Sequence, residues 1–147
     1  MLNITTFLDA NACRLDKTVF YCPERDVSYN SKEILSISSE IARQIQALGV
    51  EKGDRVMLYM NSTPEYLFSY FAVWRLGAVA IPTNRVYTPS ELSYMVENSG
   101  SKVIITDTAK IIKSIFDTIL PFCIIFNRLI HVIMTYSQIT VNECRCT

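Results

Sequence analysis

Polar side chains follow three apolar runs in this 147-residue sequence, at the point where each run ends. The polar segments are Asn61-Ser62, Pro82-Thr83-Asn84 and Asp107-Thr108. If the apolar runs form parallel strands, their carboxyl ends meet at one edge of a sheet, which is where ligands bind in open α/β sheets. The sequence therefore predicts a ligand-facing edge built from these three segments.

Two lysines, Lys110 and Lys113, follow the last of these segments and fall in or near the first turn of a helix expected after it. A cation at this end of a helix opposes the helix dipole, at a cost of about 0.3–1 kcal/mol, whereas an anion is favoured there. One interpretation is that the two lysines hold an anion. The other is that both are solvated surface side chains.

The remaining chemistry-bearing residues form no recognisable site. The five cysteines include no CxxC pair, and the single histidine, His131, has no second ligand cluster nearby, which argues against a zinc site or a disulfide framework. His131 also lacks an acid or a serine placed for a catalytic triad. The four glycines fall at predicted turns and helix ends, and neither GxGxxG nor GxxxxGK[ST] occurs, so no common phosphate-binding motif is present.

Helix signals alternate with short apolar runs. Apolar residues recur at steps of three and four across the predicted helix 33–48, which has a capping pair at Asn30 and Glu33 and ends at Gly49. Thr63-Pro64-Glu65 and the capping box Thr88-Pro89-Ser90-Glu91 predict two further helix starts. The run 55–60 is apolar without alternation, which indicates a strand buried on both faces of a parallel sheet. The runs 78–81 and 102–106 are predicted to form a second and a third strand.

Helices of this length connect parallel strands, because a hairpin turn joins only antiparallel ones. The predicted fold class is α/β, a partial parallel-sheet (βαβαβ) subdomain. A further helix and strand are expected within residues 109–126, and residues 127–147 carry no predicted element.

Composition excludes some classes of protein. Half of the residues are hydrophobic and 19% are charged, which excludes intrinsic disorder. Fourteen basic residues balance fourteen acidic ones, which argues against a nucleic-acid binder. The amino terminus lacks a basic n-region, and Arg128 interrupts the apolar stretch 111–134, so we predict no signal peptide, no transmembrane segment and a cytoplasmic location.

Three segments in order, 48–56, 74–82 and 94–107, resemble the opening of the adenylate-forming (ANL) superfamily of AMP-dependent synthetases and ligases. The resemblance covers about residues 20 to 108, and it identifies residues 1–108 as the amino-terminal part of an AMP-binding domain. Within the superfamily, one segment favours a subgroup. The residues Pro82-Thr83-Asn84, followed by the segment 87–92, are more similar to acid–CoA ligases, including fatty-acyl-CoA synthetases, than to the adenylation domains of peptide synthetases.

The resemblance implies ATP-dependent activation of a carboxylic acid, through an acyl-adenylate, to acyl-CoA, with ATP, Mg²⁺ and CoA required by the intact enzyme. It also implies that Lys110 and Lys113 contact the nucleotide phosphate of CoA. The family's Gly- and Ser/Thr-rich phosphate loop and its later catalytic motifs do not occur in this sequence. We therefore predict a truncated amino-terminal fragment that binds none of these cofactors and is inactive alone.

Two alternatives follow from the same features. The chain could be an interaction module that binds protein partners, including copies of itself through an open sheet edge. Its apolar carboxy-terminal segment could instead associate with a membrane surface.

Overall fold

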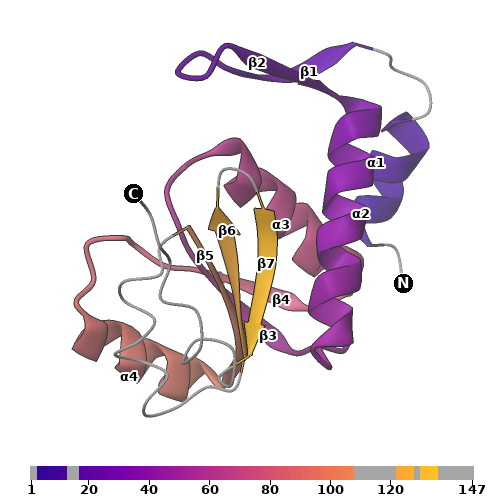
Figure 1. The fold of residues 1–147 in the computed structure, drawn as a ribbon. Helices are drawn as coiled ribbons and strands as arrows, with labels where there is room; N and C mark the ends of the chain where they lie inside the picture. The colour runs from indigo at the N-terminus through magenta and orange to yellow at the C-terminus, as the bar shows by residue number, and fades with distance from the viewer. Residues whose placement is uncertain (1–2, 13–16, 108–121, 128–129, 136–147) are drawn as a thin grey trace. The chain divides into compact units, whose positions relative to one another are not determined.

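The computed structural model describes residues 3–12, 17–107, 122–127 and 130–135. Its helices and strands, in chain order, are α1 (Ile4–Ala12), β1 (Thr18–Cys22), β2 (Val27–Asn30), α2 (Ser31–Ala47), β3 (Arg55–Tyr59), α3 (Pro64–Arg75), β4 (Val79–Pro82), α4 (Pro89–Ser99), β5 (Ser101–Thr106), β6 (Phe122–Asn127) and β7 (Ile130–Thr135) (Figure 1). The chain divides into two compact units, Met1–Gly53 with Ser62–Ala80, and Asp54–Asn61 with Ile81–Thr147.

The first unit contains three helices and a hairpin. The helices α1, α2 and α3 pack on one another, and β1 pairs antiparallel with β2 (Figure 1). Arg25, in the hairpin turn, forms an ion pair of 2.6 Å with Glu65, which connects the hairpin to the first turn of α3. The sequence patterns predict no element before Asn30, so α1 and the hairpin are features that only the structure reveals.

The ends of α2 lie where the sequence predicts them. The Asn30 side chain accepts a hydrogen bond from the backbone N–H of Glu33 at 2.9 Å, and the Glu33 carboxylate accepts one from the backbone N–H of Asn30 at 2.8 Å. This reciprocal pair is the predicted capping box. After the helix, Gly49 takes a φ of +82°, a conformation that favours glycine.

The residues of the helix α3 are apolar on nearly all sides, and none of them is exposed in the structure. Thr63 is the N-cap residue of α3 as predicted, with Pro64 at the start of the helix and Glu65 in its first turn, but the Thr63 side chain makes no capping hydrogen bond. The Thr63 hydroxyl interacts with the Glu65 carboxylate instead. Burial acts to raise the pKa of Glu65, but hydrogen bonds from Thr63, from its own backbone and from Arg25 outweigh burial and hold this pKa below its ordinary value.

The second unit is organised by a sheet in the order β4-β3-β5-β6-β7. β3 pairs parallel with β5, with Met57 opposite Ile104, and β5 pairs parallel with β6. The parallel pairing confirms the predicted α/β class. β3 and β5 supply core side chains at most 2% exposed, namely Val56, Met57, Leu58, Tyr59, Val103, Ile104 and Ile105. Full burial stabilises the fold by about 1.5–3 kcal/mol for each aliphatic side chain.

The helix α4 has both of its predicted end signals. Thr88 and Glu91 form the capping box, and their hydrogen bonds hold the pKa of Glu91 below its ordinary value. At the other end, Gly100 takes a φ of +60°. The Arg55 side chain reaches this end, where Nε donates to the carbonyl of Ser99 at 3.0 Å and Nη2 donates to that of Gly100 at 2.9 Å. Arg55 therefore joins the start of β3 to the end of α4.

The strand β6 lies at the end of residues 109–126, where a further helix and strand are expected, and that helix lies outside the described residues. β7 lies in the region where the sequence predicts no element. It pairs antiparallel with β6, with Asn127 opposite Ile130, so the pairing partner explains why an apolar run without a polar face is a strand. Within the described residues, no helix is long and apolar enough to cross a bilayer.

Candidate functional site

Asp107 is the centre of a polar cluster at the carboxyl edge of the sheet. Its Oδ2 accepts hydrogen bonds from the backbone N–H and the side-chain Nδ2 of Asn61, at 3.0 and 2.8 Å. Its Oδ1 accepts one from Nη1 of Arg85. Asn61 follows β3, Arg85 follows β4 and Asp107 follows β5, so one carboxylate joins the ends of three neighbouring strands. We call these three residues the edge cluster.

Arg85 is fixed by more than its ion pair. Its Cζ lies 5.4 Å from the centre of the Tyr59 ring, within the range of a cation–π interaction. The hydroxyl of Tyr59, a residue 1% exposed, lies 3.1 Å from the carbonyl oxygen of Arg85 and 3.4 Å from that of Tyr87. A buried aromatic residue of β3 therefore holds both the backbone and the charged group of the segment after β4.

The structure thus brings together two of the residues predicted for this edge, Asn61 and Asp107. The third predicted segment behaves differently. Both the hydroxyl and the backbone N–H of Thr83 bond to the carbonyl of Leu58 at 3.0 Å, and Thr83 is buried. The Asn84 side chain accepts a hydrogen bond from a backbone N–H two residues later and so stabilises its own turn. These hydrogen bonds shape the segment after β4.

Arg85 is the member of the edge cluster that the sequence analysis missed. One feature of the sequence could have indicated it. Arg85 has a long cationic side chain directly after Asn84, and from the end of β4 this side chain can reach across β3 to an acid at the end of β5. The other predicted edge residues are not part of this geometry. Ser62 belongs to the first unit, and Thr108 lies outside the described residues.

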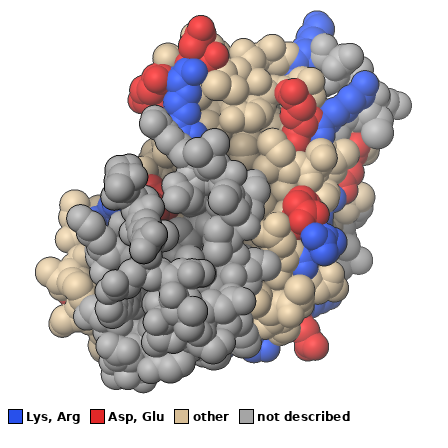
Figure 2. All heavy atoms as spheres, viewed as in Figure 1, with Lys and Arg blue, Asp and Glu red and all other residues tan. Residues whose placement is uncertain are grey.

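The edge cluster has little unused chemical capacity. Arg85 and Asp107 neutralise one another, and both oxygens of the carboxylate accept hydrogen bonds. No group of three or more His, Cys, Asp or Glu side chains that could hold a metal ion occurs in the part of the chain that the structure describes. On the face drawn in Figure 2, the basic and acidic side chains of the described residues are interspersed. The cluster is therefore suited to positioning loops.

The predicted anion-binding residues, Lys110 and Lys113, lie outside the described residues, so their role stays a prediction. The apolar composition of α3 predicts that its aromatic residues Phe68, Phe71 and Trp74 lie in the core. Phe68 is 2% exposed, whereas Phe71 and Trp74 are half-buried.

Comparison with known families gives one match over most of the chain. The model of the family described as "AMP-binding enzyme" matches residues 7–126. Among curated proteins, 4-coumarate–CoA ligase 3 of Oryza sativa subsp. japonica is 37% identical over 86 residues, and the long-chain-fatty-acid–CoA ligase FadD13 of Mycobacterium tuberculosis is 36% identical over 83 residues. These alignments cover 58% and 56% of this chain but 16% of each relative, so the matched part spans about a sixth of their length.

Solved structures agree with the fold. A Mycobacterium tuberculosis fatty acyl CoA synthetase superposes with a TM-score of 0.73 at 32% identity, over 79% of this chain and 24% of that one. The N-terminal domain of FACL13 from the same organism gives a TM-score of 0.74 at 32% identity, over 80% of this chain and 31% of that one. A benzoate CoA ligase from Burkholderia xenovorans shares the fold at 22% identity, with a TM-score of 0.77 over 88% of this chain and 27% of that one.

Proposed function

Because the chain belongs to the AMP-binding enzyme family, we propose that it forms the amino-terminal part of an acid–CoA ligase. The observation that carries the proposal is the agreement of sequence and fold over the same region. The two curated relatives described above are CoA ligases, and a fatty acyl CoA synthetase superposes on the chain at 32% identity. A fatty acid is our first candidate for the substrate, and an aromatic acid is the second.

In the proposed reaction, a carboxylate oxygen attacks the α-phosphorus of ATP, the bond to pyrophosphate breaks, and an acyl-adenylate forms. The thiol of CoA then loses its proton and attacks the acyl carbon, so that a thioester forms and AMP leaves. Mg²⁺ would neutralise phosphate charge in the first step. The described residues offer no cluster for this ion, so we assign no residue of the chain to it.

The proposed contribution of this chain is structural. The edge cluster holds the ends of β3, β4 and β5 in one arrangement, and other parts of a ligase would supply the groups that stabilise the transferring phosphoryl group. Such stabilisation is usually the largest catalytic contribution. The 147 residues are therefore proposed to be inactive alone.

Two measurements test this. The isolated chain is expected to give no ATP–pyrophosphate exchange above a protein-free blank, and exchange above the blank would contradict its inactivity. In a chimera, residues 20–107 replace the matching segment of the Mycobacterium tuberculosis ligase FadD13. The chimera is expected to form acyl-CoA from hexadecanoate, with 4-coumarate as the comparison substrate. A folded chimera that activates neither acid would refute the assignment to a ligase.

Lys110 and Lys113 are proposed to contact the nucleotide phosphate of CoA. The proposal is based on their position in the sequence after β5, at the start of the helix expected there, and on the affinity of a helix N-terminus for anions. In an active chimera extended to residue 113, Lys110→Ala is expected to raise the KM for CoA without changing the KM for ATP. An unchanged KM for CoA would leave the two lysines as solvated side chains.

The alternative function, an interaction module, is favoured by a different observation. Four large apolar side chains in α1 and β1 are more than half exposed, namely Ile4, Phe7, Val19 and Tyr21. A contiguous exposed apolar patch marks a surface that another molecule covers, so this alternative requires that the four side chains act together. Sedimentation of the isolated chain separates the two functions, because an interaction module that binds itself would change its mass with concentration.

A further inference from the structure

The sheet in the order β4-β3-β5-β6-β7 has two edge strands, and β7 is one of them. Among the described residues, β7 pairs with β6 alone. Its outer edge therefore presents backbone N–H and C=O groups that a further strand can pair. β7 also lies beyond residues 7–126, which the family model matches, so the proposed ligase function assigns this strand no role.

The two edge strands differ in how they are protected from pairing with another chain. Natural edge strands are kept from such pairing by being short, or by carrying charged residues or proline. β4 fits this rule, because it has four residues and its last residue is Pro82. β7 has six residues, Ile-His-Val-Ile-Met-Thr, and its sequence contains no proline, lysine, arginine or acidic residue. The outer edge of β7 is therefore suited to strand addition.

We propose that β7 pairs antiparallel with β7 of a second copy of this chain, so that two five-stranded sheets join into one. The pairing rests on the proposed alternative function, an interaction module that binds itself, and it names the surface that would do so. In a symmetric antiparallel pair, one residue lies opposite its own copy, because two types of residue pair alternate along the ladder. For the six residues of β7, the longest symmetric pairings place this residue at Val132 or Ile133.

The residues near this symmetry point suit a second copy as the partner. Like charges directly opposite one another destabilise a strand pair, and β-branched residues favour strands. Val132 and Ile133 are both uncharged and β-branched, so either symmetric pairing places a compatible residue opposite itself. A second copy also brings an edge strand of equal length with the same free backbone groups.

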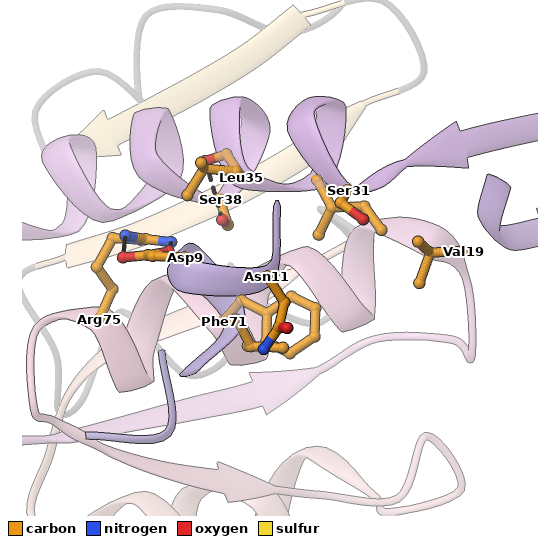
Figure 3. Close-up of a pocket in the computed structure, with 10 residues that line it drawn as sticks. Asp9, Asn11, Val19, Ser31, Leu35, Ser38, Phe71 and Arg75 are labelled. Atoms are coloured by element: carbon orange, nitrogen blue, oxygen red, sulfur yellow. Dashed lines mark hydrogen bonds and ion pairs between the residues drawn. The ribbon is translucent and has the colours of Figure 1, made fainter. Parts of the chain in front are cut away.

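A second surface of the chain is a candidate for self-association, and it supplies the control. It is the exposed apolar set of α1 and β1, where Val19, 59% exposed, lines a mainly apolar pocket of about 180 Å³ (Figure 3). The polar contacts drawn in this pocket lie within the chain, from Arg75 to Asp9 and from Ser38 to the carbonyl of Leu35. This surface belongs to the first unit and β7 to the second, so substitutions in the two can be compared.

The first measurement is sedimentation equilibrium of the full 147-residue chain. The average mass is expected to rise from that of one chain toward that of two across about 1–200 µM, an affinity typical of a small interface. Val132→Lys and Ile133→Lys place like charges at or beside the symmetry point, and each is expected to weaken the association about 5-fold or more. Val19→Lys, the same change on the first unit, is expected to change it by less than about 2-fold.

A charge swap separates repulsion between copies from damage to the fold. Val132→Lys and Val132→Glu are each expected to associate weakly alone, whereas their equimolar mixture is expected to form a heterodimer, because opposite charges then face one another. The same two substitutions are made at Ile133. Neighbouring residues of a strand lie on opposite faces of the sheet, so a position that does not tolerate a charge is replaced by one on the other face. Circular dichroism identifies the variants that fold.

Two results would overturn the proposal. One is an unmodified chain that stays monomeric at the highest concentration. The other is association that Val19→Lys abolishes and that folded β7 variants retain, which would assign self-association to the first unit. If every β7 variant unfolds, amide hydrogen exchange of the unmodified chain decides, because β7 amides are expected to exchange more slowly at high concentration, and equal rates would overturn the pairing. The ligase assignment is tested separately, because the chimera that carries residues 20–107 contains no β7.

Discussion

Replacing Asp107 with alanine should test whether one carboxylate joins the ends of three strands. The ion pair with Arg85 connects side chains that are 30% and 18% exposed. A surface pair contributes about 0–1 kcal/mol, whereas a hydrogen bond to a charged group contributes about 1.5–3 kcal/mol. At this intermediate burial we assign the pair about 1–2 kcal/mol. The two bonds from Asn61, which is exposed, add about 0.5 kcal/mol each. Asp107→Ala is therefore expected to lose about 2–3 kcal/mol of unfolding free energy.

The assay is urea unfolding of the 147-residue chain, followed by circular dichroism. With a slope of about 1–3 kcal/mol per molar, the midpoint should fall by about 1 M or more. A double-mutant cycle with Arg85→Met should return a coupling energy of about 1–2 kcal/mol. Glu97→Ala, at an exposed acid of α4, is the control and should stay within about 0.5 kcal/mol of the unmodified chain. A loss below 0.5 kcal/mol for Asp107→Ala, or an equal loss with and without Arg85, would refute the reasoning.

Three further changes have predicted results, each measured by urea unfolding. The pKa of Glu65 lies below its ordinary value, so its ionised form stabilises the folded state at neutral pH, and this stability is lost as the pH falls through the folded-state pKa. Glu65→Gln should therefore flatten the fall in stability at acid pH, and parallel curves for the two proteins would contradict this. Thr88→Ala removes a capping box and should cost about 1 kcal/mol, most of which Thr88→Ser should restore. Gly100→Ala should cost more than Gly49→Ala. Both positions have a positive φ, but only at Gly100 would the added Cβ lie 2.9 Å from Nη2 of Arg55, and equal losses would show that this approach is harmless.

Local signals account for the elements that were predicted correctly. Both capping boxes, at Asn30 and at Thr88, depend on residues three positions apart, so the sequence contains the whole interaction. The apolar run of β3 predicted burial on both faces, because alternation is lost when a strand has no solvent-facing side. These features need no knowledge of distant parts of the chain.

Other features depend on partners far away in the sequence. Asp9 pairs with Arg75, 66 residues later, and this contact holds α1 against α3, so the pattern of residues 4–12 alone does not reveal it. β7 is a strand because β6 lies beside it. Arg85 reaches an acid 22 residues later, across the order in which β4, β3 and β5 are arranged. The sequence predicted the edge but not this cation, since the strand order decides which side chains meet.

The chemistry of the edge cluster follows from the way in which its charges are balanced. A group that stabilises a transferring phosphoryl must present charge or donors that are not already compensated. The charge of Arg85 is compensated by Asp107, and its guanidinium also lies over the ring of Tyr59. Releasing Arg85 to a substrate would leave a carboxylate that is largely buried without its partner, which is costly. The edge cluster is thus more stable with the ion pair between Arg85 and Asp107 intact than with it broken. In the proposed ligase, the edge cluster would therefore act by holding the segments after β3, β4 and β5 in register. The first expected effect of removing the cluster is a lower free energy of unfolding.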